Sequence, residues 1–456
     1  MMKQIGTKAL LANSFLTTVA GVALLASSGL VSAETLNGAV QKTLDTNPEI
    51  GVAKSQRNSA RRDIDQAFGG YLPLVDLRGA GGFEDTNSPS TRGRPQVLQR
   101  GASNDRSDTR REGQLTVSQL LFDGFATPAR VGRAERLADT AANAVRDRTE
   151  RVGLSAVESY IETLRQRETV RLSEENIVVH GGYLKLVDEK FKAGRGREAD
   201  TIQAQGRYAF SQATVIQNQG RLRDIESRYA QVVGDFPGQL ERPIAPVDRL
   251  ADTADGVRAI AADQNPSLAV ARTRILAAEQ VVREAEAPFY PRLTIEGQGT
   301  LASHLNGVVG ENNSGSVLGV VRYNLYRGGA DLAATRAAKE RASEAKEALS
   351  QTQRAVDDDV RVSHNAWLTA KARVAKLKDY VAATARVRIA YEQQYNIGER
   401  SLFDLLDSEN EVFNAKVSLV AAEYAEVFGV YQTLAAAGQL IPTLGVTPPT
   451  EIELLK

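Results

Sequence analysis

Cysteine is missing from this 456-residue chain, and its absence excludes several kinds of site at once. Without a thiol there can be no disulfide, no thiolate-bound metal and no lipidated N-terminal cysteine. An excess of charge of one sign is missing too, because 56 basic residues stand against 56 acidic ones. Nucleic acid is therefore not an expected partner. After the first residues there is also no apolar run that approaches a transmembrane helix, so an inner-membrane protein is not expected.

Groups that usually carry catalysis are scarce. The three histidines, His180, His304 and His364, are far apart and have no paired metal-ligand spacing. The consecutive acids at 357–359 would point in different directions around a helix, which argues against one metal site. The glycines at 79–82 lack the strand-turn-helix context of a phosphate loop. We therefore expect no catalytic residues, no metal site and no cofactor.

The N-terminal residues have the pattern of a secretory signal. Lys3 and Lys8 precede an apolar run, and small residues follow it up to Ala33. This pattern predicts a signal peptide over 1–33 and a mature chain that begins at Glu34. A membrane anchor is the alternative, but the apolar run is short and is interrupted by polar residues between 13 and 18.

The chain contains an internal duplication. Pro48 recurs as Pro266, a shift of 266 − 48 = 218 residues, whereas Gly194 recurs as Gly398, a shift of 398 − 194 = 204 residues. The first copy therefore has 218 − 204 = 14 extra residues between these points. Two copies that differ in one surface loop predict a pseudo-symmetric unit built from two halves.

Both copies are expected to have the same order of elements. The first repeat covers 34–235, with strands at about 71–83 and 113–122, a long helix at about 127–192, a tip turn at 193–197 and a return helix at 198–233. A linker follows at 236–256. The second repeat covers 257–440, with strands at about 292–301 and 317–326, a long helix at about 330–396, a tip turn at 397–401 and a return helix at 402–437, before a C-terminal tail at 441–456.

The four strand segments alternate between apolar and polar side chains. Such segments fit either a soluble sandwich or a membrane barrel with a wet interior. Aromatic residues such as Tyr71, Phe122 and Tyr290 gather at the strand ends, as expected at the edges of a bilayer. The connecting segments 84–112 and 302–316 are polar and are expected to be external loops. Four strands cannot close a barrel in lipid, so several chains must share it; a dimer would just seal, and we favour a trimer because it leaves a real bore.

The helices are unusually long. The segment 330–396 contains no proline, and 127–192 has only Pro128 in its first turn, so each would extend for roughly 100 Å. The shorter helices of the first half would reach roughly 85 Å if they were stacked end to end. A soluble helical bundle is the alternative interpretation, but a secreted chain with bilayer-suited strands makes it less attractive.

The duplicated motifs resemble those of the TolC family of outer-membrane efflux and secretion channels. The resemblance covers essentially the whole mature chain. It depends on Asn47-Pro48 and Asn265-Pro266, on the strand ends L-F-D-G at 121–124 and L-Y-R-G-G at 325–329, and on the turns F-K-A-G at 191–194 and Y-N-I-G-E-R at 395–400. The resemblance implies a mixed, mainly α fold: a homotrimer with a twelve-stranded β-barrel, four strands per chain, in the outer membrane, continued by an α-helical barrel in the periplasm. It also implies a mixed equatorial region, which would contain the linker 236–256 as an equatorial linker and the tail 441–456 as an equatorial tail.

The function implied by the resemblance is that of an exit duct. Such a duct serves tripartite efflux or type I secretion systems and passes drugs, toxic compounds or proteins to the exterior. Its implied partners are a periplasmic adaptor protein, an inner-membrane pump or ABC transporter, and the lipid of the outer membrane. Two alternatives of other classes remain at this point: a periplasmic coiled-coil adaptor or scaffold, and a secreted enzyme, for which the sequence offers no convergent polar site.

The resemblance also places functional residues at the helical tips. Asp200, Tyr395 and Arg400 match residues that tie neighbouring helices together at the periplasmic gate. The first turn departs from the family pattern, because Arg195 and Arg197 add two charges there that could replace or supplement Arg400.

Further tip residues have two other implied roles. Asp404 and Asp407 match acidic rings of the pore, and three copies of each around a narrow axis would favour cations. The simpler interpretation is that Asp200 and Asp404 suit the dipole of a first helical turn. The tips are expected to dock an adaptor protein through Gly194, Gly398 and Glu399.

Overall fold

The computed structural model describes residues 33–86, 106–306 and 308–454. The expected signal peptide, apart from Ala33, and the middle of the expected loop 84–112 lie outside the described residues. Within the described part, none of the helices is both long and apolar enough to span a membrane.

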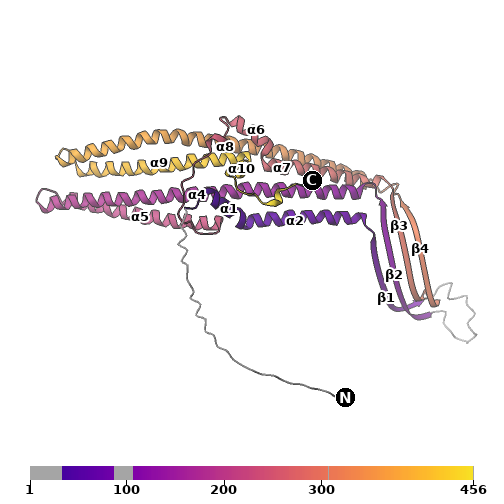
Figure 1. The fold of residues 1–456 in the computed structure, drawn as a ribbon. Coiled ribbons are helices and arrows are strands. Elements are labelled where there is room, and N and C mark those ends of the chain that lie inside the picture. Colours follow the sequence, from indigo (N-terminus) through magenta and orange to yellow (C-terminus); the bar gives the residue numbers. More distant parts are fainter. Residues whose placement is uncertain (1–32, 87–105, 307, 455–456) are drawn as a thin grey trace, which may run out of the picture.

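Two very long helices, α4 (Ala126–Lys192) and α8 (Ala330–Asn396), run the length of the helical part. Each has 67 residues and is therefore about 100 Å long. The return helices α5 (Glu198–Val233) and α9 (Leu402–Ala437) pack against them towards the tips, and α2 (Pro48–Phe68) and α7 (Pro266–Glu286) do so towards the sheet. Figure 1 shows α9 and α7 in succession between α8 and α4, with α5 and α2 in succession beyond α4.

The same asparagine device joins the stacked helices in both halves. The side chain of Asn47 caps α2 by accepting from the N–H of Glu49, and its amide donates to the last turn of α5 at Val232 O, 3.2 Å away. Asn265 caps α7 and donates to Ala436 O of α9 at 2.9 Å. Each following proline occupies a first helical position, where its missing N–H costs nothing. The Asn-Pro pair therefore starts α2 beside the end of α5, and α7 beside the end of α9.

Short elements surround this joint in the middle of the helical part. They are α1 (Leu36–Thr46), α6 (Ala254–Gln264), α10 (Leu440–Leu444) and the 3-10 turns η2 (Val247–Arg249) and η4 (Thr450–Ile452). Two further 3-10 turns, η1 (Gly69–Tyr71) and η3 (Ala287–Phe289), connect α2 and α7 to the strands that follow them. The larger apolar core lies here and includes Tyr160, Tyr229, Trp367 and Leu434.

The C-terminal tail is fastened across α4 by a buried carboxylate. Glu150 accepts the N–H groups of Leu440 at 3.1 Å and Ile441 at 3.3 Å, at the start of α10. Burial raises the pKa of Glu150 to about 7, against the smaller opposing effect of these hydrogen bonds. Further along, Thr447 and Gln41 of α1 exchange two hydrogen bonds. The tail therefore ties the end of the second half to the first.

Glu150→Gln is expected to remove a pH-dependent loss of stability. In the unfolded chain this carboxyl group ionises near pH 4.5, but in the folded chain it keeps its proton up to about pH 7. The wild type therefore loses about 3 kcal/mol from this group as the pH rises through that window. The measurement is thermal unfolding in detergent, with the midpoints of the wild type and of Glu150→Gln compared at each end of this pH window. A difference between the two proteins that does not change with pH would contradict the prediction.

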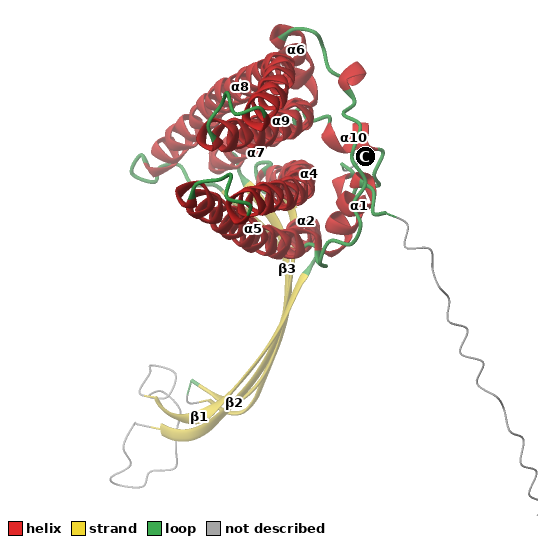
Figure 2. Ribbon diagram, turned by 90° about the vertical axis from the view of Figure 1, so that its left-hand side faces the viewer, coloured by secondary structure: helices red, strands yellow, loops and turns green. Residues whose placement is uncertain are grey.

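The four strands form one antiparallel sheet in the order β1-β2-β3-β4. Their bounds are Leu74–Thr86, Arg106–Phe122, Arg292–Leu305 and Val308–Arg322. The sheet leaves the end of the helical part that is opposite to the tips and bends away from it (Figures 1 and 2).

The expectation of an external loop over 302–316 is wrong. The β3–β4 ladder continues through it, pairing Ala302 with Asn312 and Leu305 with Val308, and β4 ends at Arg322 rather than near 326. The expected loop 84–112 is also strand at both ends. Asn, Ser and Gly suggested a loop, but an antiparallel ladder uses backbone groups, and strand preference depends on context more than on residue type.

The register separates the sheet into an apolar and a polar face. One row of paired residues consists of Val75, Val117, Gly297 and Val317, and the adjacent row consists of Asp76, Thr116, Gln298 and Ser316. The apolar face is open, with Leu77 83% and Val317 78% exposed, whereas Thr294 and Thr300 on the polar face are buried. An apolar outer face and a more enclosed polar face are what a membrane barrel with a wet interior requires.

Candidate entrance at the helical tips

Both tips are built from the same glycine turn. Gly194 and Gly398 have positive φ angles of 70° and 84°. The next N–H reaches back into the helix, from Arg195 to Lys190 O and from Glu399 to Gln394 O, both at 2.9 Å. Glycine is favoured at this position because a left-handed residue ends the helix and turns the chain. Both glycines, Arg195 and Glu399 are exposed, so the tips present backbone and charge to their surroundings.

Asp200 and Tyr395 come together from different hairpins. Asp200 lies in the first turn of α5 and pairs with Arg197, its Oδ2 lying 3.1 Å from Nε. Burial raises the pKa of the Tyr395 hydroxyl, and the charge of Asp200 raises it further. Lys190 of α4 lies over the Tyr395 ring, 4.1 Å from its centre. The tip of α8 is therefore held against the first hairpin by polar contacts.

Arg400 turns towards its own hairpin. Its guanidinium lies 4.2 Å from the centre of the Tyr391 ring, and its Nε donates to Gln394 Oε1 at 3.0 Å. The distance from Nη1 to Asp404 Oδ2 is 3.9 Å. Within one chain, Arg197 and not Arg400 is thus the arginine that holds Asp200.

The two acids expected to form pore rings have different surroundings. Asp404 forms a capping box with Ser401 at the start of α9. This agrees with the simpler interpretation, in which the Asp404 carboxylate stabilises the first turn of a helix. Asp407 is exposed one turn further along α9. The capping box leaves the carboxylate of Asp404 partly exposed at the start of α9, so its local role is compatible with a place in the pore wall.

Sequence reasoning missed an apolar cluster just above the turns. It joins both hairpins of the chain and consists of Tyr183, Val187, Ala204, Leu402, Leu405 and Leu406. The spacing of Tyr183 and Val187, and of Leu402 and Leu406, is the i, i+4 signal of a helix face. That signal predicts a buried face, but not which helix covers it.

A buried charged group above this cluster was also missed. Glu409 of α9 is 8% exposed and its Oε2 lies 3.6 Å from Nε of Arg388 on α8. Glu409 follows Leu405 by four residues and precedes Val412 by three, so a charge interrupts an otherwise apolar stripe. That interruption was the available signal in the sequence.

The helical duct, the two-faced sheet and the tip turns together define an outer-membrane channel protein. The profile of the family described as "Outer membrane efflux protein" matches residues 39–235 and 257–428. The chain belongs to this family. The unmatched residues between the two segments are those that sequence analysis assigned to the equatorial linker. The predictions of an outer-membrane location, of a mainly helical TolC-like fold and of an exit duct are confirmed.

Known relatives cover both efflux and secretion. The chain is 23% identical to "Outer membrane efflux protein BepC" of Brucella suis, over 92% of this chain and 90% of that protein. It is 25% identical to "Alkaline protease secretion protein AprF" of Pseudomonas aeruginosa, over 68% of this chain and 66% of that protein. The solved outer-membrane channel OprN has the same fold, with a TM-score of 0.73 and 20% identity over 89% of this chain and 90% of that chain. The alternative of a periplasmic adaptor is set aside by the family assignment.

Proposed function

We propose that three copies of this chain form one exit duct. The single observation that carries the proposal is the open sheet, whose order β1-β2-β3-β4 leaves β1 and β4 as edges beside an exposed apolar face. In lipid such edges must be paired, because unpaired N–H and C=O groups cost several kcal/mol each, about 2–7 by transfer measurements. Pairing β4 of one copy with β1 of the next closes the wall, and three copies give a bore wide enough for cargo.

The proposed duct continues from the barrel into the helices and ends at the tips. Asp200, Tyr395 and Arg400, with Arg197 and Arg195, form the proposed gate, and Asp404 and Asp407 form the proposed acidic rings. Support comes from the ion pair of Asp200 with Arg197, and from the charge of Asp200, which raises the pKa of the Tyr395 hydroxyl. Gly194, Gly398 and Glu399 are the proposed docking points for a periplasmic adaptor, which links the duct to an inner-membrane pump or ABC transporter. Drugs, toxic compounds and secreted proteins are the proposed cargo.

Arg400→Ser combined with Asp200→Ala is expected to open the gate. The two changes remove charge-assisted contacts from both hairpins, each worth about 1.5–3 kcal/mol, and tenfold in an equilibrium corresponds to about 1.4 kcal/mol. The mean conductance of purified channels in a planar bilayer should therefore rise by about tenfold. The matched control is Arg62→Ser with Asp65→Ala, an exposed ion pair on α2 far from the tips. Equal conductance in the two double variants would remove these residues from the gate and leave the duct intact.

A further inference from the structure

Polar groups without hydrogen-bond partners are concentrated in the tip half of the helices. Among the described residues, nine buried side-chain atoms lack such a partner, and five of them lie there. They are Asn176 Oδ1, His180 Nδ1, Thr201 Oγ1, Arg388 Nε and Glu409 Oε2. A buried polar atom left unpaired costs about 1–3 kcal/mol, so the closed arrangement of this region is expensive.

Glu409 is the acidic member of this set, and its pairing with Arg388 is incomplete. Arg388 approaches it only to 3.6 Å, while the same guanidinium donates to the half-exposed Glu392 at 2.7 Å. The other groups facing this pair are Tyr183 of α4 and Lys416 of α9, and Glu175 of α4 lines the same cavity as Glu409. The arginine is therefore shared between two carboxylates, and the one exposed to solvent has the better geometry.

Burial is the largest influence on the Glu409 carboxyl group. It raises the pKa of Glu409, and the lowering effects of Arg388 and Lys416 are smaller, while Glu392 adds to the rise. A raised pKa means that the ionised form is destabilised where it lies, because desolvation exceeds the attraction of its partners. The pair therefore does not hold the helices together; removing Glu409 from water has a net cost.

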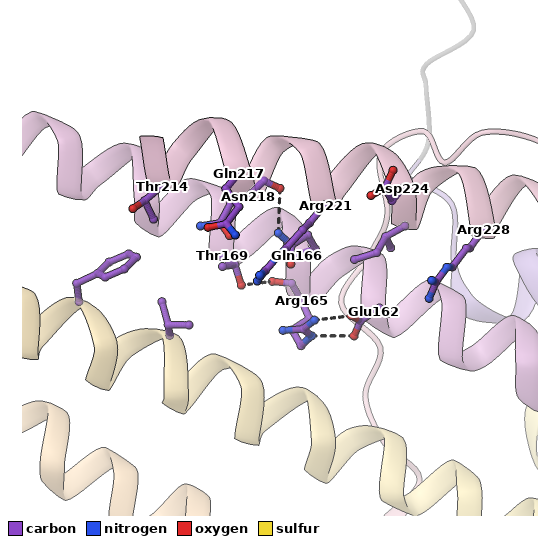
Figure 3. Close-up of a pocket in the computed structure, with 13 residues that line it drawn as sticks. Glu162, Arg165, Gln166, Thr169, Thr214, Gln217, Asn218, Arg221, Asp224 and Arg228 are labelled. Atoms are coloured by element: carbon purple, nitrogen blue, oxygen red, sulfur yellow. Dashed lines mark hydrogen bonds and ion pairs between the residues drawn. The ribbon is translucent and has the colours of Figure 1, made fainter. Parts of the chain in front are cut away.

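The packing around Glu409 is loose on both sides of the contact between α4 and α9, which we call the seam. On one side is a cavity of about 360 Å³ lined by Asn176, Glu409 and Phe413 among others. On the other side, between α5, α4 and α9, is a groove of about 450 Å³ (Figure 3), which Phe413 also lines. The groove is largely polar, with Gln166 donating to Asn218 O at 3.0 Å. Water therefore needs to travel only a short way to reach the seam once it begins to open.

We propose that Glu409 is a positioning residue that keeps the seam able to open. Separation of α4 from α9 returns its carboxylate to water and relieves the cost of burial. The closed seam binds protons more tightly than the open one, so rising pH favours opening and falling pH favours closure. This inference depends on the proposed function only in that the entrance opens by separation of the two hairpins of a chain.

The absence of cysteine allows the seam to be measured directly. Ala204 is 1% exposed within the apolar cluster between the hairpins, so an Ala204→Cys thiol reacts with a neutral reagent only when the seam opens. Labelling rates of the purified trimer are divided by those of an exposed Lys192→Cys thiol, which corrects for thiol ionisation. In this background, Glu409→Leu is expected to slow labelling by about tenfold, because an apolar side chain replaces the buried carboxylate while Arg388 keeps its ion pair with Glu392. It should also abolish the rise of the rate with pH.

Two controls separate the proposal from a loss of folding. Glu392→Gln changes the solvent-exposed partner of Arg388 and should leave the rate within about twofold, because exposed pairs contribute little. An Ala261→Cys thiol, fully buried in the larger core, reports global unfolding and should stay unreactive in every variant. Slower labelling with Glu409→Leu, and with Glu409→Gln to a smaller extent, supports the proposal. An unchanged or faster rate at Ala204→Cys, with the Ala261→Cys thiol still protected, overturns it whatever the conductance of the gate variants.

Discussion

Leu77→Lys is expected to prevent most of the protein from assembling in the outer membrane. Leu77 lies on the apolar face of β1, is 83% exposed and pairs with Leu115 of β2. A lysine facing lipid near the middle of a bilayer costs about 2–4 kcal/mol, and a trimer would carry three of them. Heat-modifiable trimers extracted from outer membranes should fall by at least about tenfold.

The control for this change places a lysine on the other face of the same sheet. Thr116→Lys puts the charge on the polar face, directly opposite Asp76. There it has water and an opposite charge, so trimer yield should stay close to that of the wild type. Equal losses for both variants would show that the sheet does not separate lipid from water.

Asp404→Asn combined with Asp407→Asn is expected to abolish most of the cation selectivity of the channel. In a trimer the two positions place six carboxylates around the narrow entrance, where their field attracts cations and repels anions. Ser401 still caps α9, and the amide oxygen of an asparagine at 404 can accept from the Ser401 N–H as the carboxylate does, so the change removes charge and leaves the helix start in place. The ratio of cation to anion permeability, from reversal potentials in a salt gradient, should fall by about tenfold, in keeping with surface potentials of several kT.

Asp63→Asn combined with Asp65→Asn is the matched control for this experiment. It removes the same number of charges from exposed positions on α2, far from the tips. At ordinary ionic strength, charges more than about 10 Å from the permeation path are screened. If this pair alters selectivity as strongly as the tip pair does, the selective field is spread along the duct and Asp404 and Asp407 have no special part in it.

Local signals in the sequence predicted the long elements closely. Helices α5, α8 and α9 have the bounds expected from the sequence, and α4 begins only one residue earlier. The reason is that glycine and Asn-Pro act through neighbouring backbone atoms, as the turn at Gly398 and the cap at Asn265 show. The segment 302–316 was predicted wrongly from local preference, because its strand structure depends on pairing between β3 and β4.

The expected gate residues were only partly brought together. The charge of Asp200 raises the pKa of Tyr395 across the hairpins, but Arg197 takes the place beside Asp200 that the resemblance had offered first to Arg400. Arg400 stacks on Tyr391 of its own hairpin instead. Proximity along the chain explains the outcome, because Arg197 precedes Asp200 by three residues and reaches it without help from another helix.

By itself, the sequence determined the duplication, the lengths of the helices, their glycine turns and the two-faced strands, because these depend on spacing and on backbone preferences within a few residues. Only the tertiary structure decided that α9 and α4 form a seam, that Glu409 is buried there against Arg388, and that Glu150 fastens the tail. Burial and electrostatic cost depend on which distant segments exclude water from a side chain. That information is a property of the packed chain and not of any short stretch of it.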